Sequence, residues 1–598
     1  EVLDMSWYNE AVFYHIYPLG LTGAPKQNDY GEPVHRLNTL LPWVDHIKEI
    51  GGSALYIGPL FESVGHGYET TDYKKLDSRL GTNEDLTAFV AYCHEQGIKV
   101  IFDGVFNHTG RDFFAFKDIQ ANRENSQYKD WYCNVNFWGN NEYNDGFSYD
   151  NWGGYNLLVK LNQKNPAVVN YICDVIRFWV SEFDVDGIRL DAADVLDFDF
   201  MKALRRTANE VKPDFWLMGE VIHGDYSRWV NGETLHSVTN YTLHKALYSG
   251  HNDHNYFEIA HTVRRLQNMG TLKLYNFVDN HDVERIYTKL TNKAHFAPVH
   301  VLLYTLPGVP SIYYGSEFGI EGRKEYGSDD SLRPALNIED YKDSVKTNPC
   351  TALIAALGKV RQAVPALSYG SYDELMLTNR QFAYARDLDG TRVIVSVNND
   401  DAPAGMHLAA GNCAAYIGAL SGEKVSVQDG HINITQPANS GEIWVPEGTD
   451  LNVKPVKAQG VNVENTNSIN TNIEASSVDT EKATDMVVED TQSETTKAED
   501  TKAAAPKAET TKTASENTAS ETTAKESESE STPNATASDN PADPETITVD
   551  WSKSPESMTV PELQAAVLAK LSGNGPVDAQ MKKTVTDNIW HDSLVNWL

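Results

Sequence analysis

Short apolar runs alternate with longer stretches of helical periodicity over the first 365 residues of the chain. Such runs, apolar over a few residues and then ending abruptly, are typical of buried strands. They lie at residues 11–20, 53–61, 99–108, 185–194, 215–221, 274–282 and 310–319. Strands that alternate with helices predict a parallel α/β sheet, either doubly wound or closed into a (β/α)8 TIM barrel.

The pattern changes twice further along the chain. Residues 366–447 lose the helical periodicity and contain short strand-like runs, which predicts a small β-sandwich domain. Residues 448–550 are rich in Thr, Ser, Ala, Glu and Lys, and no aromatic residue lies between Trp444 and Trp551. Such a segment buries too little apolar surface to offset its chain entropy, so we expect a disordered, acidic, Ser/Thr-rich linker.

The last segment, residues 551–598, regains helical periodicity. Thr559 and Glu562 form a capping-box pair before a first predicted helix. The apolar side of that helix is Val560, Leu563, Val567 and Leu571, and that of a second predicted helix is Met581, Val585, Ile589 and Trp597. So short a segment is marginal as an independent domain. We interpret it as a small helical module that either has no chemical role or docks a protein partner or the barrel itself.

Four of the predicted barrel strands end in charged or imidazole side chains. In chain order these are Asp103 and His108, Arg189 and Asp191, Glu220, and His281 and Asp282. In a parallel barrel the carboxyl ends of all strands gather on one face, where catalytic groups collect. A single carboxylate at a strand end is usually a turn residue or a helix cap, whereas four such strand ends indicate a site.

The spacing of these residues fits one closed barrel. Asp191 and Glu220 are 29 residues apart, about one strand–helix unit. Glu220 and Asp282 are 62 residues apart, about two units, so one strand without a marker lies between them.

The spacing also indicates an insertion. Asp103 and Asp191 are 88 residues apart, about two units too many for neighbouring strands. We therefore expect the barrel to span residues 1–108 and 171–365, with an inserted subdomain at 109–170 after the third strand. The insert is dense in Trp, Tyr, Asn and Gly, and its aromatic faces and amide groups suit sugar rings.

The composition excludes several classes of function. Lys and Arg number 50 against 84 Asp and Glu, and the resulting net charge of −34 repels phosphate backbones, which argues against nucleic-acid binding. No run of 18 apolar residues exists, so we expect no transmembrane segment. Five scattered cysteines fit neither a disulfide framework nor a metal site. Unpaired cysteines and a natural start at Met5 favour the cytoplasm, although the linker also fits a secreted or surface-tethered enzyme.

The strand-end carboxylates point to glycoside hydrolysis, because no nucleophilic Ser or Cys motif accompanies them. That reaction needs one carboxylate as nucleophile and one carboxylic acid as proton donor. Arg189 and Asp191 are two residues apart and share a face of the strand, so the guanidinium keeps Asp191 ionised. Glu220 follows an apolar run and is the better proton donor. The candidate contacts to sugar hydroxyls are His108, His281 and Asp282.

Residues 7–447 resemble the α-amylase family of glycoside hydrolases. The segments that carry the resemblance occur in the family's order and are DGVFNH at 103–108, GIRLDAAD at 187–194, GEV at 219–221 and FVDNHD at 277–282. The resemblance implies that Asp191 is the nucleophile, Glu220 the acid/base and Asp282 a third carboxylate that grips the sugar. It implies that Asp103 is a structural partner of Arg189. The substrate-binding residues it implies are Tyr68 as an aromatic platform, His108, Arg189, His223 and His281.

One segment points to a branch of this family. LVKLN at 158–162 is similar to the MPKLN signature of the neopullulanase and cyclomaltodextrinase branch. Lys160 stands where calcium-dependent relatives have an aspartate, so we expect no calcium at the usual interdomain site and no other cofactor. Oxygen donors that could hold a structural calcium elsewhere are Asn28, Asp29 and Glu32.

Three hypotheses about function follow. The first is a retaining hydrolase that cleaves α-1,4-glucosidic bonds in maltodextrins, cyclodextrins or starch through a covalent glycosyl-enzyme. The second is an α-glucan transglycosylase, because such an intermediate can pass to a sugar instead of water. The third is a non-catalytic carbohydrate-binding relative, which we would expect to lack one of the three acids.

Overall fold

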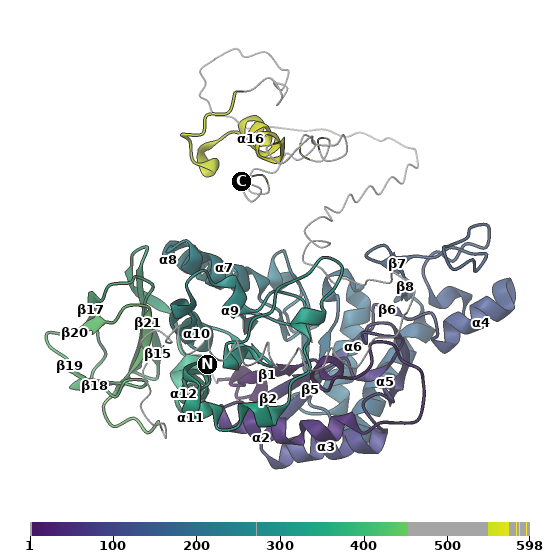
Figure 1. Ribbon diagram of the computed structural model, residues 1–598, viewed down its shortest axis with the longest axis horizontal. Helices are drawn as coiled ribbons and strands as arrows, with labels where there is room; N and C mark the ends of the chain where they lie inside the picture. Colours follow the sequence, from purple (N-terminus) through teal and green to yellow (C-terminus); the bar gives the residue numbers. More distant parts are fainter. Residues whose placement is uncertain are drawn as a thin grey trace, which may run out of the picture. The chain divides into compact units, whose positions relative to one another are not determined.

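The structure of the protein (Figure 1) is a computed structural model that describes residues 3–270, 272–451 and 548–572, together with Lys582, Val585 and Leu594. The chain forms two units, Glu1–Ala508 and Glu509–Leu598. The linker predicted at residues 448–550 lies almost entirely outside the described residues.

Eight parallel strands form the central sheet of the first unit. In sheet order they are β11 (Ser237–Val238), β10 (Trp216–Gly219), β9 (Gly187–Leu190), β5 (Lys99–Gly104), β2 (Ala54–Ile57), β1 (Phe13–Ile16), β13 (Val309–Tyr313) and β12 (Tyr275–Phe277). A parallel bridge between Thr239 and Tyr275 joins the two ends of this order. The predicted (β/α)8 barrel is confirmed, and β11 is the strand without a marker.

Helices connect these strands or follow the last of them in the chain. They are α1 (Pro18–Leu21), α2 (Leu41–Glu49), α3 (Asn83–Glu95), α5 (Pro166–Phe183), α6 (Phe198–Val211), α7 (Tyr241–Asn252), α8 (Tyr256–Asn268), α9 (Ile286–Lys289), α10 (Phe296–Thr305), α11 (Ser344–Thr347), α12 (Pro349–Ala363) and α13 (Pro365–Tyr369). Among the helices that the structure describes, none combines the length and the apolar character needed to cross a lipid bilayer.

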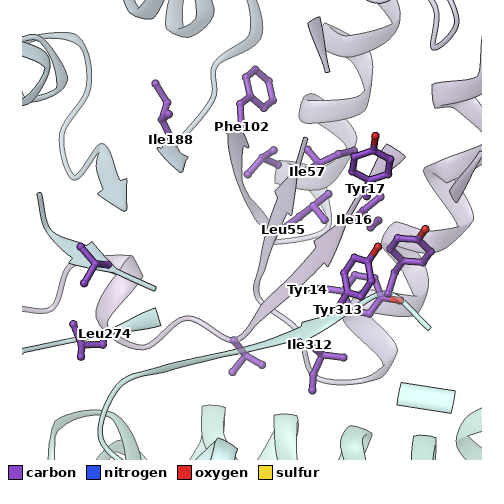
Figure 2. Packing of buried hydrophobic residues seen from close by; sticks show 14 of the residues in the cluster. Tyr14, Ile16, Tyr17, Leu55, Ile57, Phe102, Ile188, Leu274, Ile312 and Tyr313 are labelled. Atoms are coloured by element: carbon purple, nitrogen blue, oxygen red, sulfur yellow. The ribbon is translucent and has the colours of Figure 1, made fainter. Parts of the chain in front are cut away.

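Alternate residues of the barrel strands face opposite sides of the sheet. The outward set packs in the large cluster shown in part in Figure 2 and includes Leu55, Ile57, Phe102 and Ile188. The other set forms a separate cluster on the inner face and includes Phe13, Tyr56, Ile101, Trp216 and Met218. Asp103 and Arg189 have the parity of this inner set, and Asp191 and Glu220 continue it past the strand ends. The pleat of the strands therefore turns all four side chains toward the barrel axis.

The insert after the third barrel strand contains a three-stranded sheet of its own. Its elements are β6 (His108–Thr109), α4 (Phe114–Asn122), β7 (Asn151–Trp152) and β8 (Tyr155–Lys160), with sheet order β6-β8-β7. The hairpin of β3 (Phe61–Ser63) and β4 (Thr70–Leu76) precedes it in the chain. Figure 1 shows α4 and these three strands together at one end of the unit.

Helix α5 begins at Pro166, inside the segment 109–170 that the sequence assigned to the insert. The side chain of Asn165 caps the helix, and a proline at the first helical position is pre-organised for it. The helix packs against α3 and α6, and its Trp179 ring stacks on Phe61 with ring centroids 4.5 Å apart. It thus belongs to the outer layer of the barrel.

A β-sheet domain follows the barrel, as predicted. Its six-stranded sheet has the order β14 (Asp373–Leu377), β15 (Gln381–Leu388), β16 (Thr391–Asn398), β21 (Ser440–Pro446), β18 (Ala415–Gly418) and β19 (Lys424–Ser426). A second sheet pairs β17 (Ala404–Ala409) with β20 (His431–Gln436). Side chains of both sheets share one apolar cluster that includes Ile394, Met406, Leu408, Ile432 and Trp444. This packing is that of a β-sandwich.

The second unit contains helix α16 (Val560–Ser572). The carboxylate of Glu562 accepts the backbone N–H of Thr559 at 2.7 Å, one half of the expected capping box. The buried apolar cluster of the unit is Met558, Leu563, Ala566, Val567, Val585 and Leu594. The second predicted helix lies largely outside the described residues, and a docking role for this module stays a prediction.

Candidate active site

Arg189 is the centre of a buried group of acids at the carboxyl ends of β5, β9 and β10. One guanidinium nitrogen donates to Asp103 at 2.8 Å and to Asp191 at 2.9 Å, and the other donates to Glu220. All four side chains are buried. Burial by itself lowers the pKa of Arg189, but the carboxylates of Asp103 and Glu220 outweigh it and raise that pKa well above the usual value. The guanidinium therefore stays charged and holds the acids together.

Strand register explains why these residues meet. Asp103 lies directly beside Arg189 in the pairing of β5 with β9. The backbone N–H of Asp191 donates to Gly104, and that of Glu220 donates to Leu190 at 2.8 Å, so each acid continues the ladder just past its strand end. The two predicted catalytic residues thus come from neighbouring strands and share one cation.

Asp103 makes a full set of contacts with the protein. Besides Arg189, it accepts hydrogen bonds from the hydroxyls of Tyr56 at 2.8 Å and Tyr68 at 2.9 Å. Asp103 is thus an ion-pair partner of Arg189, as predicted. Burial and the Asp103 carboxylate raise the pKa of Tyr68 well above its usual value, so the phenol stays protonated and donates.

His281 and Asp282 lie near this group and are linked to it through Tyr68. The Tyr68 hydroxyl lies 2.5 Å from Nε2 of His281. The imidazole is nearly parallel to the rings of both Tyr17 and Tyr68, with centroid distances of 5.9 Å in each case. Tyr68 is buried, and it meets His281 through its hydroxyl.

Arg333 holds Asp282 in place, and sequence reasoning missed it. Its guanidinium donates to Asp282 at 2.9 Å and to the backbone carbonyl of His281 at 3.0 Å, and it lies 4.6 Å from the ring centroid of Tyr17. Asp329, from the same loop after β13, lies 3.4 Å from the guanidinium. The sequence shows only that Arg333 lies in a long charged loop after the last barrel strand, and this does not reveal which residue it contacts.

The other two predicted binding residues lie further out. His108 is buried on β6, and its Nδ1 lies 3.1 Å from the side-chain nitrogen of Asn107. His223 is exposed and lies three residues beyond Glu220. The structure therefore brings Arg189, Asp191 and Glu220 into direct contact. Tyr68 links His281 and its neighbour Asp282 to this group through Asp103. His223 lies exposed at the surface, apart from these contacts.

Two hollows are lined by residues that contact the acids or follow them closely in the chain. The first, of about 850 Å³, is lined by Tyr17, His66, Glu69 and Arg333 among others, and we call it the Arg333 hollow. The second, of about 790 Å³, is lined by Trp152, Lys160, Asp194, His223 and Trp229 among others, and we call it the His223 hollow. Asp282 is tied to the first hollow by Arg333, whereas the chain after Asp191 and Glu220 leads into the second.

The residues beside Asn107 do not fit a calcium ion. The ammonium of Lys160 donates to the side-chain oxygen of Asn107 and to the carbonyl of Val195, the latter at 3.0 Å. It thus uses the oxygen that a cation would need and repels a dication. Within the parts of the chain that the structure describes, no three His, Cys, Asp or Glu side chains are grouped as a metal site.

Similar proteins cover most of the first unit. A family model for the alpha amylase catalytic domain matches residues 36–359. Cyclomaltodextrinase of Thermoanaerobacter pseudethanolicus is 32% identical over 419 residues, 66% of this chain and 71% of that protein. Neopullulanase 2 of Thermoactinomyces vulgaris is 29% identical over 473 residues, 73% of this chain and 78% of that protein. A solved cyclomaltodextrinase structure has a TM-score of 0.66 at 26% identity, covering 74% of this chain and 79% of that one.

Proposed function

Because the chain belongs to the α-amylase family of glycoside hydrolases, we propose that the buried acids around Arg189 are the active site with which it cleaves α-1,4-glucosidic bonds. The chain is a retaining α-glucan hydrolase, as is general for this family. The observation that carries the assignment of residues is the contact of one guanidinium with both Asp191 and Glu220. The reading as a non-catalytic carbohydrate-binding protein is set aside, since all three acids are present.

Asp191 acts as the nucleophile in this proposal. Its carboxylate attacks the anomeric carbon while Glu220 gives a proton to the glycosidic oxygen, and the bond to the leaving sugar breaks. Glu220 then takes a proton from water, which attacks the glycosyl-enzyme and frees Asp191. Two inversions at one carbon return the original α configuration.

Arg189 positions both acids without reacting. Three acidic side chains surround it, and the hydroxyls of Tyr56 and Tyr68 donate hydrogen bonds to Asp103. Asp103 therefore serves as a fixed counter-ion behind Arg189. The guanidinium keeps Asp191 in its nucleophilic, ionised form and fixes the side chain of Glu220 beside it.

Asp282 and its neighbours bind the sugar that is being cleaved. Arg333 and the stack of Tyr17, His281 and Tyr68 restrict the motion of this part of the site. We propose that Asp282 and His281 hydrogen-bond to sugar hydroxyls, which favours a distorted ring. Tyr68 and His108 complete this subsite, the former as the aromatic platform.

The direction of the bound chain follows from the proton donor. Glu220 must lie on the leaving-group side of the scissile bond, and the chain after it leads to His223. We therefore assign the His223 hollow to the leaving part of the glucan and the Arg333 hollow to the part that stays covalently attached.

Maltodextrins, including cyclic ones, are the proposed substrates. The relatives named as cyclomaltodextrinase and neopullulanase support this choice. The test is to incubate the full chain with β-cyclodextrin, maltotriose, pullulan and soluble starch and to follow the products by proton NMR. We expect β-cyclodextrin and maltotriose to be cleaved with the α-anomer formed first. Turnover of none of the four would refute the proposed function.

Transfer to a sugar is the second candidate reaction. The side chains of Trp152 and Trp229 line the His223 hollow, and aromatic rings there would hold an acceptor sugar as well as a leaving one. Added glucose or maltose should then appear in longer products at the expense of hydrolysis.

The remaining expectations are also proposals. Because Lys160 occupies the oxygen of Asn107, we propose that hydrolysis needs no calcium at this position. All five cysteines are free thiols, which supports the cytoplasm as the location of the protein.

A further inference from the structure

The inserted segment carries a third hollow, of about 800 Å³, that the reaction described above does not use. Its lining includes Glu124, Asn134, Trp138, Ser148, Tyr149 and Asp150, and we call it the Trp138 hollow. The side chain of Trp138 is 99% exposed. Full exposure of so large an aromatic side chain is uncommon on a folded domain. This hollow therefore displays one large aromatic face to solvent, surrounded by polar groups.

We propose that the Trp138 hollow is a second glucan-binding site, in which the indole stacks on a glucose ring of the substrate beyond the catalytic cleft. This inference rests on the proposed function, because it names the same polymer as the ligand. Glucose rings present apolar C–H faces and hydroxyl edges. An indole covers such a face, and amide and carboxylate groups beside it accept and donate hydrogen bonds to the edges.

The loop holds Trp138 in its exposed position. The backbone N–H of Trp138 donates to the side chain of Asn136 at 3.0 Å, which forms a tight turn. Asn136 and Ser148 exchange two backbone hydrogen bonds of 2.8 and 3.0 Å across the loop. Gly139 lies so close to Ser148 that an added Cβ would be 2.4 Å from its hydroxyl oxygen. The tip is thus closely packed, and the tryptophan is presented by a fixed backbone.

The polar groups needed for sugar hydroxyls lie beside the indole. The amide of Asn134 donates to the carboxylate of Asp150 at 2.7 Å, so these two side chains form one polar wall. Glu124 and the Ser148 hydroxyl contribute to the same lining. Phe137, next to Trp138, also lines the hollow, but the guanidinium of Arg123 lies 5.5 Å from its ring centroid. Trp138 therefore offers the more open aromatic face to a ligand.

Continuity with the catalytic cleft identifies the occupant. Tyr149 and Asp150 line both the Trp138 hollow and the His223 hollow. The Tyr149 hydroxyl accepts from Arg111 at 2.9 Å and donates to the carbonyl of Asn156 at 2.8 Å, so the shared wall is fixed. A glucan that leaves the cleft past Glu220 and His223 would follow this wall to Trp138. A long glucan can occupy the catalytic cleft and the Trp138 hollow at the same time, whereas a trisaccharide bound in the cleft gains less from the Trp138 hollow.

The test compares Trp138→Ala and Trp138→Phe with a matched control. Phe257→Ala removes an exposed aromatic side chain from α8, outside the three hollows. For each variant, kcat/KM is measured on soluble starch and on maltotriose, and affinity for soluble starch is measured by gel electrophoresis with the polymer in the gel. We expect the starch-to-maltotriose ratio to fall about five- to tenfold in Trp138→Ala, with weaker retardation in the gel.

Three outcomes separate the possibilities. Trp138→Phe should keep most of the ratio, because it retains an aromatic face, and Phe257→Ala should keep all of it. If Trp138→Ala behaves like the Phe257 control on starch while the wild type cleaves both substrates, the second site is refuted and the proposed function stands. If the wild type cleaves none of starch, maltotriose, β-cyclodextrin and pullulan, the proposed function itself fails.

Discussion

The ammonium of Lys160, at the end of β8, donates a hydrogen bond to the side-chain oxygen of Asn107, which lies between β5 and β6. The same ammonium donates to the carbonyl of Val195 at 3.0 Å, directly after the segment that carries Asp191. Burial lowers the pKa of Lys160, while Cys133, Asp150 and Asp194 act in the opposite direction. One side chain therefore ties the insert to two loops of the barrel face.

This brace predicts that stability is independent of calcium but depends on the lysine. We expect EDTA or added calcium to leave the Tm unchanged, and Lys160→Met to lower it by roughly 2–5 °C, because it removes the hydrogen bonds from the ammonium to the oxygens of Asn107 and Val195. Lys164→Met, at an exposed position on the same segment, is the matched control. Thermal melts of the three proteins decide it. A large drop in EDTA that calcium restores would contradict the brace.

Arg333 is predicted to be required for productive sugar binding. Its replacement by Ala frees Asp282 from a 2.9 Å hydrogen bond and removes the cation above Tyr17, so the carboxylate that we propose to bind the sugar loses its position. We expect kcat/KM on maltotriose to fall by about 10²-fold, as for displaced positioning groups. Arg323→Ala changes an exposed arginine of the same loop and should have little effect. If Arg333→Ala kept the same kcat/KM on maltotriose as Arg323→Ala, Arg333 would have no role in sugar binding.

The two acids should be distinguishable by chemical rescue. Both Asp191→Ala and Glu220→Ala should lose about 10³-fold or more in turnover on maltotriose. With α-maltosyl fluoride, whose leaving group needs no acid, and added azide, Glu220→Ala should form the α-azide through the covalent intermediate. Asp191→Ala should form the β-azide by direct displacement. Product configuration is read by proton NMR, and the reverse pattern would exchange the two roles.

Lys273 predicts a pH dependence of stability. Burial, and then Arg361 and Arg386, lower its pKa to about 7, while the unfolded chain keeps the proton to about pH 10. The cost of the buried charge is therefore full below pH 7 and declines as the pH rises from 7 to 10, because there the unfolded state binds more protons. Lys273→Met should raise the Tm by roughly 2–4 °C at pH 6 and by less at pH 9.5.

The control for this prediction is Lys342→Met, at an exposed position, which should show no such trend. Melting curves of both variants and the wild type at the two pH values provide the comparison. A gain from Lys273→Met that grows with pH would contradict the direction of the shift.

The barrel and its acids could be predicted from the sequence because their signals are local. Strand β9 is short and contains Arg189, with Asp191 directly after its end, and the pleat alone puts both on the inner face. The start of α5 was also predictable, since Asn165 and Pro166 are typical residues for the start of a helix. The predicted insert nevertheless ended at residue 170, inside this helix. Strand β11 is only two residues long and does not end in a charged or imidazole side chain, so the sequence carries no direct sign of it.

Arg333 could not be predicted in the same way. It lies in a loop about 20 residues beyond the last barrel strand, and its contact with Asp282 depends on the path of that loop through space. The direction of Tyr68 toward His281 and the continuity of the Trp138 and His223 hollows are likewise tertiary facts. No periodicity or spacing along the chain encodes them.

The account rests on Asp191 as the nucleophile, and trapping the glycosyl-enzyme tests that most directly. The wild-type and Glu220→Gln proteins are incubated with 5-fluoro-α-maltosyl fluoride, digested, and analysed by tandem mass spectrometry. The account predicts one added sugar on the peptide that contains Asp191, and none in Asp191→Asn. A sugar attached to Glu220, Asp103 or any other residue would contradict it.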